Sequence, residues 1–579
     1  MNTTQAAQYT GSRILIESLV EQGVDTIFGY PGGAVLNIYD ELYRHRDRIR
    51  HVLVSHEQHA AHAADGYARA TGKTGVCLAT SGPGATNLVT GIATAYMDSI
   101  PLVAITGNVV NNLLGRDSFQ EVDITGITMP VVKHNWIVKN VSELAEVIRE
   151  AFIVVRSGRP GPVLIDITKD VTAAHADISS YLFNTSATIS ERATRLTERN
   201  ARETFTGADI AKAAELISAA ERPMIYAGGG VIISNAASEL RQLAERINAP
   251  VAQSLMGQGA LSHTHQLWTG MLGMHGTVAS NKAIQKADLL ITIGARFSDR
   301  VTSSAGQFAK NAQILHFDID PAEINKNIRS TAFVSGDIKK IILSVLEKLP
   351  RQFEHPEWLR EIAHWKTLVP ASHNLDADGT VPLHPRFIIE ETGRILGENT
   401  LVVTDVGQHQ MWTSQFFPFS APRQFITSGG LGTMGFGLGA ALGARLGCPD
   451  KTVVLFTGDG SFRMNCAELG TFAAEKTGVL VIVLNNGVLG MVRQWQNLFY
   501  DKRYSQTILD RPPDFVRLAE AYNGRGFRAK QNSEFIAALN EAKKIIADGI
   551  PCVIDAVIDK DAMVLPMVPG GKPIDEQII

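Results

Sequence analysis

The sequence has few cysteines and no excess of positive charge. Its cysteines, Cys77, Cys448, Cys466 and Cys552, are far apart, so the close pairs of a zinc site or a redox CxxC motif are missing and a reducing, cytoplasmic setting fits best. Lys and Arg number 54 against 58 Asp and Glu, a formal net charge of −4. Without a positive field, neither nucleic acid nor an anionic membrane surface is expected as a partner.

The sequence also lacks a recognisable targeting segment or membrane span. Its first twelve residues contain no Lys or Arg and lead into an amphipathic run, which predicts neither a secretory nor a transit peptide. Residues 429–447 imitate a membrane helix, with Gly435, Gly439 and Gly443 at GxxxG spacing, but Arg445 interrupts the run and its many glycines suit lipid poorly. We expect these glycines to allow close backbone packing in a soluble domain.

Apolar runs alternate with helical patterns along all 579 residues. The runs are rich in β-branched residues and end in Gly, Asp or Asn, and most are followed by a helical pattern. Such strands separated by helices indicate parallel sheets covered on both faces, so we predict an α/β fold of three doubly wound domains. The predicted domains span 1–172, 208–350 and 380–579, with linkers at 173–207 and 351–379, where strand runs are missing. Ligands should lie outside the carboxyl ends of the strands.

Two polar motifs follow neighbouring predicted strands in the last third of the chain. The run TVVLFT leads into Gly458-Asp459-Gly460-Ser461, and VLVIVL leads into Asn485-Asn486. Asp459 and Asn486 are 486 − 459 = 27 positions apart, about one strand-helix-strand unit, so the two loops should emerge side by side. A carboxylate and an amide oxygen at adjacent strand ends, with glycines that let the backbone approach, suit a magnesium ion that holds a diphosphate.

Glu57 begins a helical pattern directly after the strand-like run HVLVS. Taken alone, it is most simply a helix N-terminal carboxylate favoured by the helix dipole. Gly458-Asp459-Gly460 with Asn485-Asn486, however, resembles the fingerprint of the thiamine diphosphate-dependent enzymes, and this context favours a catalytic role for Glu57. This resemblance implies that Asp459, the side chain of Asn486 and the backbone carbonyl of Val488 hold magnesium against the diphosphate.

The resemblance implies catalytic roles for Glu57 and Met434. Glu57 would hydrogen-bond the aminopyrimidine ring and favour an imino form that takes the proton from the thiazolium carbon, a task for a buried carboxyl. Met434 would wedge between the two rings and bend the cofactor, although core packing is the more common role of a methionine. The further thiamine diphosphate contacts implied are Tyr30, Pro83, Asn87, Val406, Gly407, Gln408, His409, Gly432, Gly458, Gly460, Ser461, Leu489, Gly490 and Met491.

Longer stretches of the sequence point to one family among the thiamine diphosphate-dependent enzymes. They include FGYPGGA, SGPGATN, GRPGPVLIDI, GARFSDR, TDVGQHQMW and LPMVPGG. With them, most of the chain resembles the catalytic subunit of the acetohydroxyacid synthase family, also called acetolactate synthases. The resemblance implies that pyruvate is decarboxylated on thiamine diphosphate and that the hydroxyethyl carbanion is ligated to a second 2-oxo acid. Pyruvate would give 2-acetolactate and 2-oxobutyrate would give 2-aceto-2-hydroxybutyrate, both in branched-chain amino acid biosynthesis.

Substrate contacts follow from the same resemblance. Arg300 would bind the carboxylate of the second oxo acid, with a surface ion pair to Asp299 as the alternative. Trp495 and Met274 would form the apolar wall that receives the extra methylene of 2-oxobutyrate, and Val406 would contact the methyl group of the first pyruvate. Residues at the substrate entry or beside the thiazolium ring would be Phe119, Gln120, Lys169, Tyr30 and Gly33. Gln120 and Lys169 are candidate catalytic residues, although Lys169 is equally well explained as a solvated lysine after a strand.

The central domain carries a weak nucleotide signal. The segment AGGGVI at 227–232 follows a strand-like run, but its spacing is not GxGxxG and a tight turn explains it as well. The resemblance implies that this region binds FAD, which takes no net part in the redox-neutral reaction. The implied FAD contacts are Arg159, Gly228, Gly229, Leu255, Met256, His275, Gly294, Arg296, Asp318 and Asp337.

Three departures from the family pattern stand out. Ser298 replaces one of two usual acidic residues near the predicted flavin site, and Gly439 stands where a proline is usual. The run Asn465-Cys466-Ala467-Glu468 replaces a more usual Asn-Ile-Gln-Glu. None of these changes removes a predicted catalytic group.

Alternative functions share the scaffold or use it differently. Catabolic acetolactate synthase and pyruvate oxidase are the close alternatives, whereas Glu57 argues against glyoxylate carboligase, which lacks that carboxylate. A flavin or nicotinamide dehydrogenase built on AGGGVI and a non-enzymatic scaffold are alternatives of other classes. The resemblance also implies a homodimer or dimer of dimers, in which the domains bearing Glu57 and Asp459 face each other across a subunit interface, and a small regulatory subunit as a further partner.

Overall fold

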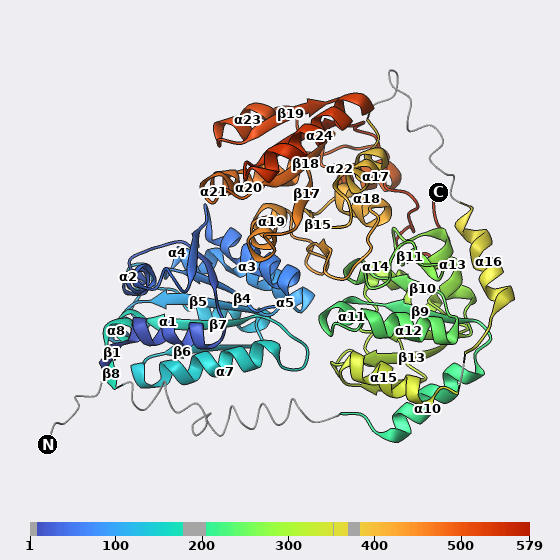
Figure 1. The fold of residues 1–579 in the computed structure, drawn as a ribbon, viewed down its shortest axis with the longest axis horizontal. Coiled ribbons are helices and arrows are strands. Elements are labelled where there is room, and N and C mark those ends of the chain that lie inside the picture. The colour runs from blue at the N-terminus through green and yellow to red at the C-terminus, as the bar shows by residue number, and fades with distance from the viewer. Residues whose placement is uncertain (1–7, 178–203, 351, 369–382) are drawn as a thin grey trace.

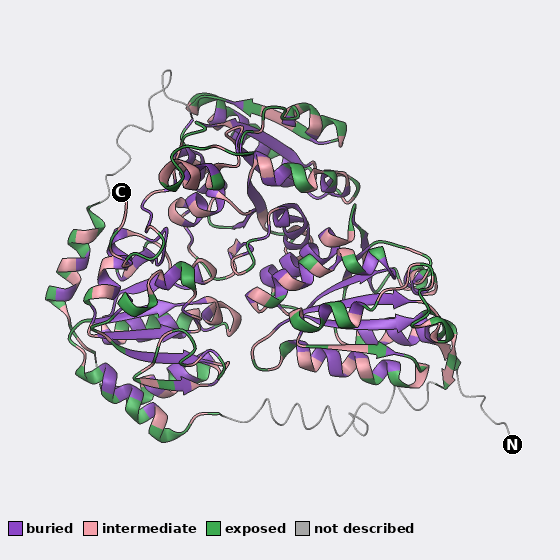
Figure 2. Ribbon diagram, turned by 180° about the vertical axis from the view of Figure 1, so that it is seen from behind, coloured by how far each residue is buried: buried purple, intermediate pink, exposed green. Residues whose placement is uncertain are grey.

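The apolar runs of the sequence form three six-stranded sheets in which all paired strands are parallel. The computed structural model describes residues 8–177, 204–350, 352–368 and 383–579. Each sheet is the centre of one domain, with helices on both faces (Figure 1). Figure 2 shows the strands buried and the outward faces of the helices exposed, which is the burial that continuous apolar strands require. The predicted three-domain α/β fold is therefore confirmed.

The N-terminal sheet has the strand order β3-β2-β4-β5-β7-β6. Its strands are β2 (Thr26–Gly29), β3 (Arg50–Leu53), β4 (Gly75–Ala79), β5 (Leu102–Asn108), β6 (His134–Val138) and β7 (Val163–Thr168). Its helices are α1 (Gly11–Glu21), α2 (Leu36–Arg44), α3 (Glu57–Thr71), α4 (Pro83–Asn87), α5 (Val89–Asp98), α6 (Ile124–Thr128), α7 (Leu144–Arg156) and α8 (Lys169–Ala173). A separate antiparallel pair joins β1 (Gln8–Thr10) to β8 (His175–Asp177).

The C-terminal sheet has the order β16-β15-β17-β18-β20-β19, which matches the N-terminal sheet strand for strand. Its strands are β15 (Thr400–Thr404), β16 (Phe425–Ile426), β17 (Thr452–Gly458), β18 (Val479–Asn485), β19 (Arg525–Ala529) and β20 (Cys552–Val557). Its helices are α17 (Pro385–Leu396), α18 (Gln408–Phe416), α19 (Phe436–Gly447), α20 (Asp459–Asn465), α21 (Leu469–Ala474), α22 (Gly490–Phe499), α23 (Phe515–Ala521) and α24 (Asn532–Ala547). In both sheets the second strand lies outside the first, so the order reverses direction between β2 and β4 and between β15 and β17.

The central sheet is wound differently, in the order β11-β10-β9-β12-β13-β14. Its strands are β9 (Pro223–Ala227), β10 (Val251–Gln253), β11 (Trp268–Met271), β12 (Leu289–Ile293), β13 (Gln313–Asp318) and β14 (Ala332–Ser335). Its helices are α10 (Gly207–Ala219), α11 (Gly229–Ile233), α12 (Ala237–Ile247), α13 (Val278–Lys286), α14 (Asp299–Thr302), α15 (Ile338–Lys348) and α16 (Pro356–Lys366). Counted from the first strand this is the order 3-2-1-4-5-6 of dinucleotide-binding sheets, whose ligands lie at the reversal between strands 1 and 4, here β9 and β12.

The N-terminal and C-terminal domains meet along two helices, α3 and α19, which lie side by side (Figure 1). Glycines of α19 bring the backbones together: a Cβ atom at Gly443 would lie 1.8 Å from the carbonyl oxygen of Ala63, and one at Gly439 would lie 2.8 Å from Cβ of His62. This contact accounts for the apolar, glycine-rich run at 429–447, as we expected. Gly439, one of the departures from the family pattern, lies within this contact.

The predicted linkers lie partly outside the described residues, which omit 178–203, 351 and 369–382. The described part of the second linker is not an extended connection, because α16 occupies it and packs against the central domain. Trp358 and Ile362 are buried on one face of α16, and the indole N–H of Trp358 donates to the carbonyl of Pro223 at 3.0 Å. Proline at the first helical position and these two apolar residues four apart are a helix signal in the sequence.

The last residues of the chain also leave the C-terminal domain. Val568 and Ile574 are buried in a core cluster of the central domain, and the backbone N–H of Val568 donates to the carbonyl of Met274. The predicted C-terminal domain therefore ends in a segment that covers the central domain. None of the helices among the described residues combines the length and apolar character that crossing a membrane requires.

Candidate active site

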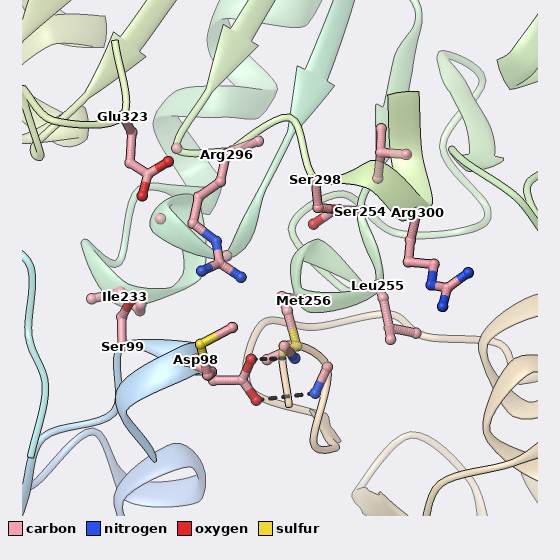
Figure 3. Close-up of a pocket in the computed structure, with 18 of the residues that line it drawn as sticks. Asp98, Ser99, Ile233, Ser254, Leu255, Met256, Arg296, Ser298, Arg300 and Glu323 are labelled. Carbon is pink, nitrogen blue, oxygen red and sulfur yellow. Dashed lines mark hydrogen bonds between the residues drawn. The ribbon is translucent and has the colours of Figure 1, made fainter. Parts of the chain in front are cut away.

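A cavity of about 1360 Å³ opens where the three domains meet. Figure 3 shows its walls: Asp98 and Ser99 come from the N-terminal domain, and Arg296, Ser298 and Arg300 come from the central domain. Loops of the C-terminal domain, residues 406–407 and 428–432, complete the lining. The cavity gathers nine predicted flavin contacts, which are Arg159, Gly229, Leu255, Met256, His275, Gly294, Arg296, Asp318 and Asp337.

The tenth predicted flavin contact, Gly228, lies at the reversal of strand order in the central sheet. Its backbone N–H donates to the carbonyl of Ile293, and the N–H of Gly230 donates to the carbonyl of Gly294 at 3.0 Å. A Cβ atom at Gly228 would lie 2.1 Å from the carbonyl oxygen of Gly294, and Gly294 has a φ of 59°. The loops after β9 and β12 therefore touch through glycine backbone, and α11 begins beside the cavity.

Polar groups at this end of the cavity are partly unpaired. Burial raises the pKa of Asp318 to about 6 and lowers the pKa of His275 to about 4, so the imidazole is neutral at pH 7. His275 Nδ1 is buried and has no partner among the described residues. Arg159 donates to Ser99, Asp320 and Glu323, which joins the N-terminal and central domains. Asp337 lines the cavity, but its side chain also caps α15 by accepting from the N–H of Lys340.

The same cavity holds the predicted substrate contacts Met274, Arg300, Val406 and Trp495. Arg300 is 67% exposed; its Nη1 lies 3.9 Å from the sulfur of Met274, and its Nε lies 3.8 Å from an Asp299 oxygen. The ion pair that we considered as an alternative is thus present, but it is long and exposed and contributes little. Gly407, Gly432 and Met491, three of the predicted thiamine diphosphate contacts, lie on the same wall.

The predicted magnesium ligands lie together at the carboxyl ends of β17 and β18, outside the lining of the cavity. Asp459 is buried, and its Oδ2 accepts from the N–H of Gly487 at 3.0 Å. Burial is the main reason why the pKa of Asp459 rises to about 7. Asn486 donates to Gln408, and its Oδ1 accepts from the N–H of Val488 at 3.2 Å. Glycines pack against this group: Cβ atoms at Gly458 and Gly490 would meet His409 and Gln408, and one at Gly460 would meet Leu489.

Other predicted thiamine diphosphate contacts lie near the reversal of strand order between β15 and β17. Ser461 Oγ donates to the carbonyl of Val406 at 3.1 Å, which joins the loops after β17 and β15. His409 is buried with its Nε2 unpartnered among the described residues, and burial lowers its pKa to about 3. Met434 precedes α19, whose start is fixed by Asp405: one carboxylate oxygen accepts from the N–H groups of Gly435 and Gly437.

The predicted pyrimidine contacts Glu57 and Asn87 lie in the N-terminal domain, where the segments that follow β3 and β4 meet. Asn87 Nδ2 donates to Oε2 of Glu57 at 3.0 Å, so the helix that begins at Pro83 holds the carboxylate of Glu57. Glu57 is half-buried, as the first residue of α3. A Cβ atom at Gly84 would lie 2.8 Å from Cγ2 of Thr80 and 3.3 Å from Oε1 of Glu57, so the start of α4 packs closely against both side chains.

Other predicted entry residues are exposed on the N-terminal domain. Phe119 is 89% exposed, Tyr30 is 41% exposed, and Gly33 and Lys169 are exposed as well. Gln120 has a φ of 58° and lies against Gly82, so its backbone occupies the left-handed region that costs energy for a residue with a side chain.

Some lining residues were not predicted from the sequence. Asp98 accepts from the backbone N–H groups of Gly429 and Gly430 at 3.0 and 2.7 Å, drawn as dashed lines in Figure 3, and Arg69 donates to Asp98 at 2.9 Å. Glu323 binds Arg159. The contacts of Asp98 with Gly429 and Gly430, and of Glu323 with Arg159, join residues more than 150 positions apart, and no local pattern in the sequence marks them.

Comparison with known proteins agrees with this arrangement. Three domain families match in order: the thiamine pyrophosphate enzyme N-terminal TPP binding domain at residues 9–127, the central domain at 210–349 and the C-terminal TPP binding domain at 405–556. The chain therefore belongs to the thiamine pyrophosphate enzymes and, as its relatives show, to the acetolactate synthase large subunits.

Similar relatives come from bacteria and archaea. An acetolactate synthase of Mycobacterium bovis is 47% identical over 586 residues, covering 98% of this chain and 91% of the relative. The acetolactate synthase isozyme 3 large subunit of Escherichia coli is 43% identical over 575 residues and 98% of each chain. A probable acetolactate synthase large subunit of Methanocaldococcus jannaschii is 46% identical over 570 residues, 97% of this chain and 94% of the relative.

Proposed function

We propose that this protein is an acetolactate synthase that joins the two-carbon unit of pyruvate to a second 2-oxo acid. The observation that carries this proposal is the cavity between the three domains, in which Arg300, Trp495 and Met274 lie together beside the flavin candidates. A guanidinium beside an apolar wall suits a small oxo acid with a carboxylate at one end and an alkyl group at the other.

Thiamine diphosphate and magnesium fit the residues at the ends of β17 and β18. The buried carboxylate of Asp459 lacks a Lys or Arg partner in the described hydrogen bonds and ion pairs, and burial raises its pKa, so a bound cation would stabilise its ionised form. Asn486 and the carbonyl of Val488 offer the oxygen ligands that magnesium prefers. His409 Nε2, buried and unpartnered, offers a donor or acceptor to the bound cofactor.

The bound cofactor supplies an acidic thiazolium carbon and an electron sink for decarboxylation. Glu57 would exchange a proton with the bound cofactor through its carboxylate, and Asn87 fixes one oxygen of that carboxylate so that the other is free for this exchange. Arg300 orients the second oxo acid through its carboxylate, and Trp495 with Met274 excludes water from the alkyl end. Val406 lies on the same wall, where it would contact the first substrate.

FAD fits the central domain. The sheet has the dinucleotide-binding order, the glycines at 228–230 and 294 let a ligand approach the backbone, and His275 offers a buried, unpartnered nitrogen. The reaction needs no net oxidation, so the flavin would be a resident structural group. Pyruvate oxidase chemistry would instead make it redox-active, and bleaching of the flavin by pyruvate without oxygen, in step with turnover, would favour that alternative.

We also propose that a second copy of the chain completes each active site, and that the enzyme works in the cytoplasm as a dimer or dimer of dimers. The exposed Phe119 and the strained Gln120 support a partner on that face of the N-terminal domain. Because the relatives are named large subunits, a small regulatory subunit is proposed as a further partner.

The decisive experiment measures the products that form when pyruvate and 2-oxobutyrate compete, with and without added thiamine diphosphate, magnesium and FAD. We expect 2-acetolactate and 2-aceto-2-hydroxybutyrate only when thiamine diphosphate and magnesium are present. Glu57→Gln should reduce the formation of both products to a small residual rate while flavin binding, read from the visible absorbance, persists. Unchanged product formation by this variant would refute the role of Glu57, and absence of both products from the wild-type protein would refute the function.

A further inference from the structure

Glu57 stands on a helix end that is tied to the C-terminal domain of the same chain. The backbone N–H of Ser55, two residues before Glu57, donates to Oε2 of Glu468 at 3.2 Å. The hydroxyl of Ser55 donates to the carbonyl of Ala467 at 3.0 Å, and the hydroxyl of Thr471 donates to the carbonyl of Leu53 at 3.4 Å. The strand end that leads into α3 therefore rests on the turn Cys466–Glu468 and the start of α21.

Glu468 also holds the helix on the other side of Glu57. Nδ1 of His59, two residues after Glu57, hydrogen-bonds the same carboxylate oxygen of Glu468. The side chains of His59 and Glu468 are 2% and 0% exposed, so water does not compete for this contact. One buried carboxylate thus binds groups on both sides of Glu57, and these groups lie 409 and 413 positions away from it in the chain.

We propose that Glu468 is a positioning residue for Glu57. It fixes the first turn of α3, and Asn87 fixes the carboxylate of Glu57 that this turn carries. The inference rests on the proposed function, because a catalytic carboxyl must be held within about half an ångström of its productive place. It gives a role to the Asn465-Cys466-Ala467-Glu468 segment, in which the glutamate and the backbone carbonyl of Ala467 make the contacts.

The test compares Glu468→Gln and His59→Ala with Glu475→Gln. Glu475 is the matched control because it also joins the two domains, through an ion pair with Arg50, but that pair is more exposed and does not touch residues 55–59. In the protein without cofactor, amide hydrogen exchange followed by mass spectrometry should accelerate in peptides covering residues 54–60 in Glu468→Gln and His59→Ala. Exchange in Glu475→Gln should stay at the wild-type rate in the same peptides.

With saturating cofactors we expect Glu468→Gln to lower kcat by about 10- to 100-fold, since an ångström of misplacement is worth this much. The KM for pyruvate and the affinity for thiamine diphosphate, read from tryptophan fluorescence, should change less than about threefold because Glu468 lies outside the cavity lining. On the residual activity of Glu57→Gln, measured at high enzyme concentration, Glu468→Gln should have no further effect, because it acts through Glu57.

Wild-type kcat in Glu468→Gln, or an equal fractional loss in both Glu57 backgrounds, would overturn the inference. If Glu468→Gln does not fold, the same exchange and kcat measurements on His59→Ala test the inference. Failure of the proposed function is distinguishable, because the wild-type protein would then form no product while the exchange experiment would still report whether Glu468 holds the helix.

Discussion

At the scale of single residues, substitution of Arg300 tests whether this arginine binds the substrate or is only a surface charge. If it binds the carboxylate of the second oxo acid, Arg300→Gln should lower kcat/KM by about 10- to 100-fold, the value of a charge-assisted hydrogen bond of about 1.5–3 kcal/mol. Arg300→Lys should recover part of this loss, because lysine keeps the charge without the planar fork. Steady-state kinetics with each oxo acid measure both effects.

Asp299→Asn is the matched control for Arg300. It removes the exposed ion pair, in which the closest atoms are 3.8 Å apart, and leaves the cavity-lining guanidinium in place. We expect its kinetic constants to stay within about twofold of wild type. A loss as large as that of Arg300→Gln would mean that the pair with Asp299, rather than direct binding, explains the arginine.

Asp405 gives a prediction for pH dependence. Burial raises its pKa to about 6 from the ordinary value of 3.8, although it accepts from Gly435, Gly437 and Thr457. The folded state therefore holds the proton more tightly than the unfolded chain, so this residue's contribution to stability is full below about pH 4 and declines as pH rises to about 6. Asp405→Asn cannot ionise, and it keeps an acceptor for the two glycine N–H groups.

The difference between the apparent unfolding midpoints of Asp405→Asn and the wild type should increase in favour of the variant from pH 4.5 to 7. Above pH 7 this difference should stay constant. The full gain corresponds to at most about 3 kcal/mol for a shift of roughly two pKa units. Circular dichroism melts of the cofactor-free proteins at one scan rate measure it, because a chain of this size can unfold irreversibly. Parallel pH profiles of the two proteins would show that Asp405 is ionised in the folded state throughout this range.

Residues that follow buried strands were predictable, and residues that act across domains were not. Asp459 and Asn486 were found because small and polar residues directly after apolar runs must lie at the carboxyl edge of a parallel sheet. Glu468 and Asp98 bind groups that only the packing of the N-terminal domain against the C-terminal domain brings near, and a single sequence does not reveal such long-range pairs. The resemblance to a family supplied Arg300 and Trp495, which no spacing rule would have selected.

At the scale of elements, the contact between α3 and α19 depends on glycine. Gly443→Ala would place a methyl group 1.8 Å from the carbonyl oxygen of Ala63, so the two helices must move apart. We expect a loss of about 1–3 kcal/mol or more in unfolding free energy, the usual cost of overpacking. Gly207→Ala, at a helix start with open space around it, is the control and should be neutral or slightly stabilising.

Thermal melts of both glycine variants measure this difference. If Gly443→Ala melts like its control, the domains are not held together along these helices in solution.

The order of the strands in each sheet also belongs to the scale of elements. Alternating strands and helices predict doubly wound sheets, but the sequence does not distinguish the 2-1-3-4-6-5 order of the outer domains from the 3-2-1-4-5-6 order of the central one. Packing of each crossover helix decides this, through contacts between distant segments.

At the scale of the whole molecule, the two halves of the proposed thiamine diphosphate site lie on different domains. Glu57 and Asn87 belong to the N-terminal domain, and Asp459, Asn486 and His409 belong to the C-terminal domain. Neither group lines the cavity that the three domains of one chain enclose. We therefore expect Glu57 of one subunit to serve Asp459 of another, in a symmetric dimer where each interface carries two sites.

Subunit complementation tests this expectation. Glu57→Gln and Asp459→Asn should each be inactive alone, but a mixed dimer would contain one site with both native residues. After unfolding and refolding together in equal amounts, random pairing should restore about a quarter of the wild-type activity. Light scattering on the same samples reports the assembly. Refolded wild type is the control for recovery, and a mixture that stays inactive while wild type recovers as a dimer would place both residues of each site in one chain.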